Sequence, residues 1–456
     1  MVSKDRISFE NAPSIIAPPP GPKSLILLDK QNKMETQART YTKIFKFAIK
    51  EARGATIMDV DDNIFIDWFA GIAVMNMGHN HPEIRKALLE QIDKIVHVPE
   101  IPTEIRIEFL ENLLKTLPGN MKNNAKVLFT TTGADACEAS TSLARYITGK
   151  KTIVAFGGAY HGISGGISAT TGNYHYREFG GFRYENVHHL PYPYAYRFPF
   201  KVKEDDMSKF IVDNLEYLIK DPYAGTGPIA GVLVEPVQGE GGYVVPPDDF
   251  LPMLREITEK YSIPLIVDEV QTGVGRTGKV WASEHYNVTP DIMCISKGIG
   301  NGIPVSMVAF KKEYDENLPQ GFRLGTYRGN PLGLAAGNAV LKILMKGEIL
   351  ERVEKNGKYI LKRFSEIQEK SEVIGDVRGK GYMIGVEIVK NKKTKEPWQE
   401  MANSIKERMF KKGVLMHTCG HYSNVLRFMA PLIIEDDLIE KGIEIFEESL
   451  KESKAK

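Results

Sequence analysis

The feature that most constrains the fold is a set of three apolar runs, each followed at once by polar or ionisable residues. They are Ile229 to Val234 before Glu235, Leu265 to Val267 before Asp268 and Glu269, and Ile292 to Ile295 before Ser296 and Lys297. Strands buried on both faces of a parallel sheet read as continuous apolar runs, and ligands bind beyond their carboxyl ends. The pattern therefore predicts a parallel sheet with a ligand site at the edge where Asp268 and Lys297 lie.

Helical and strand patterns alternate from about residue 80, which indicates βαβ units. Lys126 to Phe129 and Thr152 to Phe156 read as short strands, with a helix from Ala139 to Ile147 between them. Such alternation is typical of an α/β fold with helices on both faces of a mainly parallel sheet. An amphipathic pattern predicts another helix over His81 to Val96, and a turn-forming Asp-Asp-Asn predicts a hairpin over Asp59 to Asp67.

A smaller α+β domain is expected towards the C-terminus. The expected elements are a long helical region from 329–336 to about Lys370, strands at Val377 to Ile388 and Val425 to Phe428, and a last helix from Glu435. The proline-rich residues 17–22 are expected to be extended. We therefore expect an N-terminal arm with part of the small domain (1–65), a large domain (66–335) and a C-terminal small domain (336–456).

Composition excludes several classes of protein. The chain has 59 Lys and Arg against 58 Asp and Glu, so it offers no excess of positive charge for nucleic acid. No apolar run approaches the ~18 residues that span a bilayer, and the N-terminus lacks a signal-peptide pattern. Three cysteines are too few for a disulfide framework and fit a reducing compartment. We expect a cytoplasmic protein that binds neither nucleic acid nor membrane.

Asp268 and Lys297 carry the strongest chemical signal, because each ends a buried strand. A partly desolvated lysine suits Schiff-base chemistry, and a buried carboxylate can hold a pyridine nitrogen protonated. A structural ion pair is the alternative interpretation. The segment from Lys126 to Glu138 runs through a threonine-glycine turn into a helix, where free N–H groups bind phosphate and Gly133 permits close approach. Together these features predict pyridoxal 5'-phosphate, which has a phosphate, a carbonyl and a basic ring nitrogen.

With these residues in place, the chain resembles the class III aminotransferases, the ω-amino acid type of pyridoxal-phosphate enzyme with fold type I. The motifs that carry the resemblance are Gly71–Val74, Gly78–Pro82, Tyr160–Gly162, Glu235–Gly242, Asp268–Gly273, Ser296–Gly298, Thr326–Pro331, Val377–Gly379 and Val425–Phe428. The family includes 4-aminobutyrate and ornithine aminotransferases, and amino-acid racemases are built on the same fold. The resemblance implies a large domain with a seven-stranded type of sheet, a smaller α+β domain, and a homodimer or a dimer of dimers.

The resemblance also implies roles for single residues around the cofactor. Lys297 forms the covalent link to the cofactor and moves the proton at the substrate Cα, and Asp268 pairs with the ring nitrogen. The further cofactor contacts that it implies are Gly133 and Ala134 at the phosphate, Val270 under the ring, Tyr160 above it together with His161, Gln271 at the phenolic oxygen, and Thr326 from the neighbouring subunit.

Three residues are implied for the substrate. Arg427 pairs with an α-carboxylate, and Glu240 engages Arg427 when the donor is an ω-amine without one. Ile72 lines the pocket, as in 4-aminobutyrate aminotransferases. These residues favour amino transfer between a small amino acid and an oxo acid, with 4-aminobutyrate or ornithine as examples of the donor.

Departures from the family pattern favour an alternative function. Ala134 lacks a phosphate-binding hydroxyl, and Arg328 replaces a glycine typical of the family. Ile163 stands where transaminases for 4-aminobutyrate and 2-oxoglutarate usually place an arginine, and isoleucine cannot form a bidentate pair with a distal carboxylate. A racemase needs no such pair. Racemisation at Cα is therefore the alternative, with Lys297 as one base and Glu240 as a candidate for the second.

Two further patterns imitate other kinds of site. Gly273 to Gly278 spells GxGxxG, but no helix signature follows, so a dinucleotide is not expected. His417, Cys419 and His421 are legitimate zinc ligands, but their spacing fits no standard site. We therefore expect no metal.

Overall fold

The computed structural model describes residues 6–178 and 186–454, which divide into two compact units. The larger unit comprises residues 83–355 and 379–383, and the smaller one comprises the chain up to Pro82, residues 356–378 and the chain from Ile384. The domain limits expected at 65/66 and 335/336 fall inside these units. Helix α10 (Pro331–Met345) stays with the larger unit because it packs along α5 (Glu104–Thr116).

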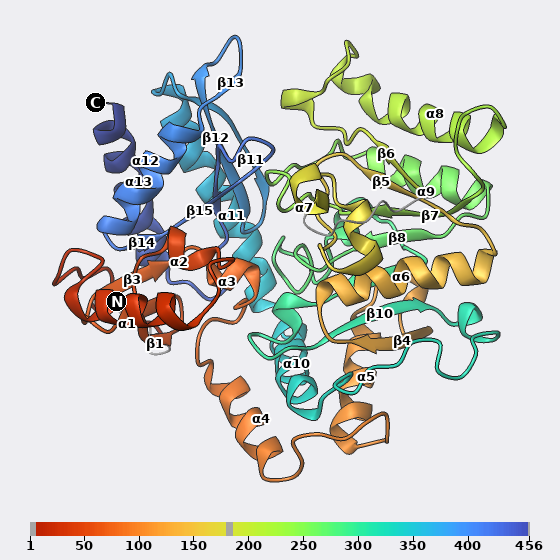
Figure 1. Cartoon of the computed structure of the whole chain (residues 1–456), viewed down its shortest axis with the longest axis horizontal. Coiled ribbons are helices and arrows are strands. Elements are labelled where there is room, and N and C mark those ends of the chain that lie inside the picture. Colours follow the sequence, from red (N-terminus) through yellow and green to blue (C-terminus); the bar gives the residue numbers. More distant parts are fainter. Residues whose placement is uncertain (1–5, 179–185, 455–456) are drawn as a thin grey trace. The chain divides into compact units, whose positions relative to one another are not determined.

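The larger unit is built on a seven-stranded sheet in the order β4-β10-β9-β8-β7-β5-β6, which Figure 1 shows from β4 below to β6 above. Its strands are β4 (Ala125–Thr130), β5 (Thr152–Phe156), β6 (Val187–Leu190), β7 (Ile229–Val234), β8 (Leu265–Asp268), β9 (Ile292–Ile295) and β10 (Ser306–Lys311). Strands β5 to β9 pair in parallel, and β10 is antiparallel to both β4 and β9. The predicted α/β fold with a mainly parallel, seven-stranded sheet is confirmed.

Helices cover both faces of this sheet because successive residues of a buried strand point to opposite sides. Val154, Val232 and Val267 pack with α8 (Met207–Lys220) and α9 (Phe250–Lys260). Ile153, Leu233 and Ile266 pack instead with α6 (Gly133–Thr148). Since β4 and β9 are both antiparallel to β10, β4 points the same way as β7 to β9. Helix α6 therefore begins at the sheet edge where the three apolar runs end.

The remaining helices of the larger unit differ in part from the sequence expectation. They are α4 (Pro82–Ile92), α5, α7 (Tyr174–Glu178), α10 and the start of α11 (Glu348–Glu369), and short 3-10 turns join several of them. The helical region expected from 329–336 to Lys370 is two helices, because Gly347 adopts a left-handed φ of 86° between them. Such a conformation ends a helix readily at glycine.

The smaller unit contains two antiparallel-rich sheets, ordered β1-β2-β3-β14 and β11-β12-β16-β15, with β13 beside β12. Its strands are β1 (Ile49–Arg53), β2 (Thr56–Asp59), β3 (Ile64–Asp67), β11 (Ile374–Lys380), β12 (Met383–Asn391), β13 (Glu396–Pro397), β14 (Val414–Leu415), β15 (His417–Cys419) and β16 (Val425–Phe428). Its helices are α1 (Pro22–Met34), α2 (Tyr41–Ile44), α3 (Ala70–Ala73), the part of α11 from Asn356 onward, α12 (Gln399–Lys411) and α13 (Asp436–Lys454). The hairpin expected over 59–67 is β2 and β3, whereas the single strand expected over 377–388 is the hairpin β11 and β12.

Candidate active site

A cavity of about 220 Å³ lies in the larger unit where β7, β8 and β9 end and α6 begins. Its lining residues are Gly133, Ala134, Cys137, Tyr160, His161, Gly162, Ile163, Ser164, Glu235, Glu240, Asp268, Val270, Gln271 and Lys297. The placement follows the sequence argument, because the polar residues that end the three apolar runs meet at one edge. Nine of the residues assigned to the site from sequence line this one cavity.

Asp268 is a buried side chain of the cavity, with a relative exposure of 3%. Its Oδ2 lies 2.8 Å from His161 Nδ1 and accepts the thiol proton of Cys137 at 3.3 Å, while Oδ1 accepts Val270 N–H at 2.9 Å. A carboxylate only accepts, so the histidine nitrogen that faces it carries the proton. These three donors fix the position of the aspartate carboxylate in the cavity lining.

Cys137 had no functional role in the sequence argument, and the structure places it beside Asp268. A hydrogen bond with Cys294, together with burial and the nearby Asp268 charge, raises the pKa of the Cys137 thiol well above its usual value. The thiol therefore stays protonated and donates. The Cys137, His161 and Asp268 ligand atoms all lie within 4.8 Å of one another, but two of the three act here as donors to the third. Cys137 lies one helical turn beyond Gly133, a spacing that puts both on one face of α6.

Lys297 follows β9 in a left-handed backbone conformation, with a φ of 49°. Side chains other than glycine, asparagine and aspartate rarely adopt this region, and strained residues of this kind concentrate at functional sites. The conformation ends the strand abruptly and turns it into a 3-10 turn over Lys297–Ile299. The Lys297 side chain thereby lines the same cavity as Asp268.

The start of α6 forms a cradle for an anion. Gly133 and Ala134 are the first two residues of the helix, positions whose N–H groups have no acceptor inside a helix. Thr132 caps the helix by accepting Asp135 N–H at 3.2 Å. A Cβ on Gly133 would lie 2.7 Å from Val270 Cγ1, so only glycine lets the helix start lie this close to the loop after β8. Free amides and the helix dipole favour phosphate here.

Glu235 holds the other wall of the cavity, a role that sequence reasoning did not assign although this residue ends β7. Its carboxylate accepts Tyr160 N–H at 2.9 Å and Gly239 N–H at 2.8 Å. Burial raises the pKa of Glu235 to about 7, because desolvation outweighs these hydrogen bonds. The side chain thus joins the end of β7 to two loops, one with Tyr160 and one with Glu240.

The remaining cavity residues offer polar and apolar contacts. Gln271 is 7% exposed, and its Oε1 is buried with no hydrogen-bond partner among the described residues. His161 Nε2 is in the same situation. A polar ligand in the cavity would satisfy such atoms. Ile163 is 44% exposed at the cavity wall, so its apolar side chain faces whatever the cavity binds.

Three residues assigned to the site lie outside this cavity lining. Thr326 is exposed in the turn at 325–329 of the larger unit. Ile72 and Arg427 belong to the smaller unit. Ile72 has a left-handed φ of 65° in α3, and Arg427 is fully buried on β16, where it pairs in register with Gly385 of β12.

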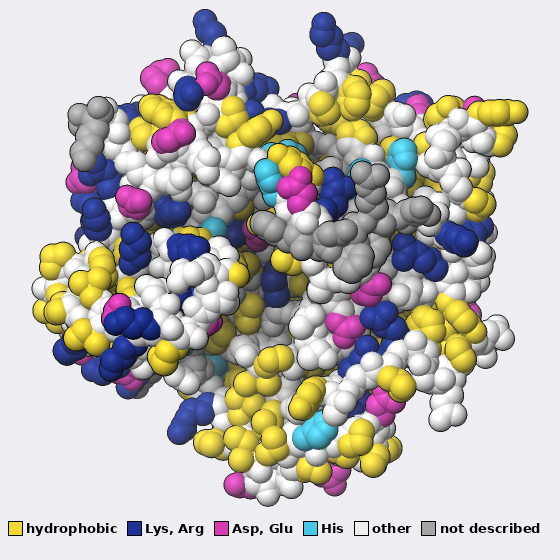
Figure 2. Space-filling view, viewed as in Figure 1, with side chains coloured by type: hydrophobic (Ala, Val, Ile, Leu, Met, Phe, Trp, Pro, Cys, Tyr) yellow, Lys and Arg dark blue, Asp and Glu magenta, His cyan; other side chains and the backbone are white. Residues whose placement is uncertain are grey.

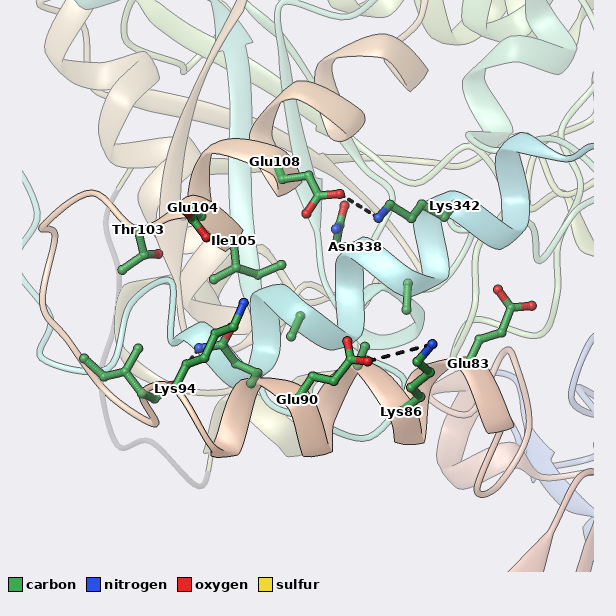
Figure 3. Close-up of a pocket in the computed structure, with 15 residues that line it drawn as sticks. Glu83, Lys86, Glu90, Lys94, Thr103, Glu104, Ile105, Glu108, Asn338 and Lys342 are labelled. Carbon is green, nitrogen blue, oxygen red and sulfur yellow. Dashed lines mark hydrogen bonds and ion pairs between the residues drawn. The ribbon is translucent and has the colours of Figure 1, made fainter.

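A second cavity, of about 420 Å³, lies among α4, α5 and α10. In Figure 2 apolar side chains gather over this lower part of the face shown, and Figure 3 shows charged side chains around the cavity itself. Lys342 pairs with Glu108 at 2.6 Å and Lys86 with Glu90 at 3.8 Å. These pairs leave the cavity near neutral. In the described residues, no helix combines the length and apolar character needed to cross a membrane.

Known proteins are similar to this chain over most of its length. The family model described as "Aminotransferase class-III" matches residues 36–450. The chain is 36% identical over 423 residues to a diaminobutyrate–2-oxoglutarate aminotransferase of Rhizobium meliloti (strain 1021), covering 91% of this chain and 90% of that protein. It is also 36% identical over 449 residues to an alanine/serine racemase of Pyrococcus horikoshii, covering 97% and 93%. The fold is similar, with a TM-score of 0.84 at 30% identity, to a PLP-bound amine transaminase from an uncultivated Pseudomonas species, covering 92% and 97%.

Proposed function

The chain belongs to the class-III aminotransferase family, and from this premise we propose that it transfers an amino group between a small amino acid and an oxo acid. It is an enzyme of fold type I, and its cofactor is pyridoxal 5'-phosphate. The observation that carries the proposal is the meeting of Lys297, the His161–Asp268 pair and the start of α6 in one cavity. These residues fit the cofactor: backbone amides for a phosphate, a carboxylate for a ring nitrogen, and an amine for a carbonyl.

Each group of the cavity performs one task in this reaction. Pyridoxal 5'-phosphate, when bound, supplies a carbonyl for the amine and a ring that accepts the electron pair left at Cα. Asp268, held in place by His161 and Cys137, would pair with the ring nitrogen and keep a proton on it. Gly133 and Ala134 hold the phosphate through their N–H groups. Val270 and Tyr160 would contact the ring, and Gln271 would bind its phenolic oxygen, since all three line the cavity.

Lys297 carries the proton transfer that decides the product. Its amine would take the proton from the substrate Cα and hold it for return to the cofactor, which would keep the amino group while water supplies the oxygen of the released oxo acid. We propose that Arg427 binds the substrate α-carboxylate, that Glu240 allows an ω-amine to act as amino donor, and that Ile72 lines the substrate pocket. The fully buried guanidinium of Arg427 supports this assignment, since a buried arginine suits a bidentate pair with a carboxylate.

The experiment uses the holoenzyme with single enantiomers of 2,4-diaminobutyrate, alanine and ornithine, and with 4-aminobutyrate, in heavy water. In wild type we expect amino transfer only when an oxo acid is present. In Lys297→Ala we expect loss of amino transfer and loss of the visible absorption band of the adduct between lysine and cofactor. Loss of optical rotation with deuterium at Cα in the absence of an oxo acid would defeat the transaminase proposal. A protein that shows no cofactor band after incubation with pyridoxal 5'-phosphate would overturn the cofactor assignment.

Racemisation is the second candidate, and Ile163 is the observation that favours it. An isoleucine exposed at the cavity wall gives a distal carboxylate no charged partner at that position. The similarity to the alanine/serine racemase supports the same candidate. Racemisation needs a second base on the other face of Cα, and we assign that role to Glu240. If the enzyme is a racemase, Glu240→Gln should abolish proton exchange from one enantiomer while leaving exchange from the other.

We further propose a homodimer, alone or paired into a tetramer, with Thr326 acting on the partner's cofactor. Large apolar side chains are exposed on α4, on the segment after it and on α5; they are Leu89, Ile92, Ile95, Val96, Ile101 and Ile107. Exposed apolar patches of this kind mark protein interfaces. Mixing Lys297→Ala and Thr326→Ala subunits tests the arrangement, because a residue acting in trans leaves one intact site in each hybrid. Hybrids with no recovered activity would show that Thr326 acts in its own subunit.

A reducing, cytoplasmic location completes the proposal. The three cysteines all lie in the described part of the chain, are buried and form no disulfide. Fractionation of the native cells with an antibody to this protein tests the location directly. Recovery with a secreted fraction would contradict it.

A further inference from the structure

Arg328 is a buried guanidinium whose hydrogen-bonding capacity is mostly unused. Its side chain is 5% exposed, although residues 324–327 just before it are exposed. Nη2 lies 3.4 Å from Asp135 Oδ1, and Nε and Nη1 are buried with no hydrogen-bond partner among the described residues. A buried charge is expensive unless it is paired and hydrogen-bonded. The Arg328 guanidinium therefore needs a second anionic partner in addition to Asp135.

The turn at 325–329 holds Arg328 in this place. Its N–H donates to Gly325 O at 3.3 Å, and its side chain packs so tightly on Gly325 that a Cβ there would overlap Nε. Gly329 has a φ of 61° and lies against Arg106, whose Nη2 donates to Gly329 O at 3.0 Å. The Arg106 guanidinium in turn lies 4.9 Å from the centre of the Phe129 ring on β4. Two glycines and a second arginine thus build the site around Arg328.

The surroundings of Arg328 carry excess positive charge at the start of α6. Asp135 is the third residue of this helix, and its Oδ2 accepts Thr131 N–H at 3.1 Å. Its Oδ1 receives Arg328 and also Arg323, whose Nη2 lies 3.0 Å away. One carboxylate therefore faces two guanidinium groups and the positive end of the helix dipole. Arg323 has a further acceptor in Ser142 Oγ at 3.3 Å, whereas the described part of the chain offers the Arg328 side chain no second acceptor.

We propose that Arg328 is a cofactor-binding residue that pairs with the phosphate of pyridoxal 5'-phosphate in its own subunit. Its partner Asp135 directly follows Gly133 and Ala134, the residues whose amides we assign to that phosphate. The Arg328 guanidinium takes the place of the phosphate-binding hydroxyl that Ala134 lacks. The inference rests on the cofactor given under the proposed function.

The test compares the binding of two cofactor forms to apo-protein. Pyridoxal 5'-phosphate and pyridoxal, which lacks the phosphate, are titrated by absorbance into wild type, Arg328→Ala and the matched control Arg323→Ala. We expect Arg328→Ala to weaken binding of the phosphorylated form about 10- to 100-fold, the usual range for losing a charge-assisted hydrogen bond. Pyridoxal affinity should change less than about threefold, and Arg323→Ala should change either affinity by no more than that. Arg328→Lys, which keeps a point charge, should fall between wild type and Arg328→Ala.

Three outcomes would overturn the inference. They are unchanged affinity for pyridoxal 5'-phosphate in Arg328→Ala, equal weakening of both cofactor forms, and a raised KM for the oxo acid with unchanged cofactor affinity. The last result would make Arg328 a substrate residue. Should Arg328→Ala fail to fold, Arg328→Lys decides, together with the phosphorus NMR shift of the bound cofactor, which should move in that variant. Failure of wild type to bind pyridoxal 5'-phosphate would instead overturn the cofactor itself.

Discussion

Replacing Glu269 with glutamine should stabilise the larger unit at pH 8 more than at pH 5. Glu269 is fully buried directly after Asp268 and accepts Ser283 N–H at 2.8 Å and the Thr272 hydroxyl at 2.5 Å. Burial raises the pKa of this carboxyl from 4.5 to about 7. Glutamine has the same shape, keeps a carbonyl oxygen for Ser283 and can donate to Thr272, but carries no charge to desolvate.

The size of this stability change follows from the difference between the pKa of Glu269 in the unfolded chain and in the folded chain. The unfolded chain loses this proton near its ordinary pKa and the folded chain near 7, so the stability that the neutral carboxyl provides is full below pH 4.5 and is lost as the pH rises through 7. At about 1.4 kcal/mol per pKa unit, wild type loses about 2.5 kcal/mol between pH 5 and pH 8. The glutamine variant does not titrate, so its advantage over wild type should grow by that amount.

Thermal unfolding of the holoenzyme at the two pH values measures this growth. For a unit of about 280 residues, 2.5 kcal/mol corresponds to about 4 °C in the unfolding temperature. Glu235 titrates in the same range but is present in both proteins, so its contribution cancels. Glu256→Gln, on the exposed side of α9, provides the control. Its unfolding temperature should differ from that of wild type by the same amount at both pH values. A Glu269→Gln difference that stays constant within about 1 °C would refute the reasoning.

Other substitutions test the cavity itself. Gly133→Ala should weaken cofactor binding about tenfold, because its Cβ would lie 2.7 Å from Val270 Cγ1. Unchanged cofactor affinity in the absorbance titration would show that the Val270 side chain can move to make room. Ile163→Arg should raise kcat/KM for 2-oxoglutarate about tenfold relative to pyruvate, since a partly exposed arginine–carboxylate pair contributes about 1.4 kcal/mol. Equal ratios before and after the change would contradict a distal-carboxylate position at residue 163. His161→Phe removes a donor to Asp268 and should slow the half-reaction with an amino acid about tenfold, as followed by stopped-flow absorbance.

The parts of the fold that sequence predicts best are those with a short, repeated physical signal. The continuous apolar runs locate β7, β8 and β9, because only strands buried on both faces dispense with polar positions. The direction of β10 leaves no such trace, since an antiparallel strand inside a buried sheet is as apolar as a parallel one. Likewise, the break at Gly347 and the turn at Gly381 depend on backbone angles that a single glycine permits but does not require.

The residues of the candidate site also differ in how well the sequence predicts them. Asp268 and Lys297 are visible in sequence because they end strands, and their neighbours follow from a family motif. Glu235 and Cys137 act through contacts with distant segments, a backbone amide of Tyr160 and the carboxylate of Asp268, which no local pattern encodes. Arg328 shows the limit most clearly. Its departure from the family glycine can be read in the sequence, but its burial against Asp135 requires the fold.

The carboxylate of Glu235 also bears on how one scaffold could give rise to different enzymes. It attaches the two loops of the cavity by their main-chain amides, at Tyr160 and at Gly239, rather than through the neighbouring side chains. Ile163 and Glu240 lie just beyond these anchor points. Mutation can therefore exchange the groups that face the substrate while the loops keep their course around the cofactor. Such an arrangement lowers the number of simultaneous changes that separate a transaminase from a racemase, and it makes these two loops the natural place to begin directed evolution of this chain.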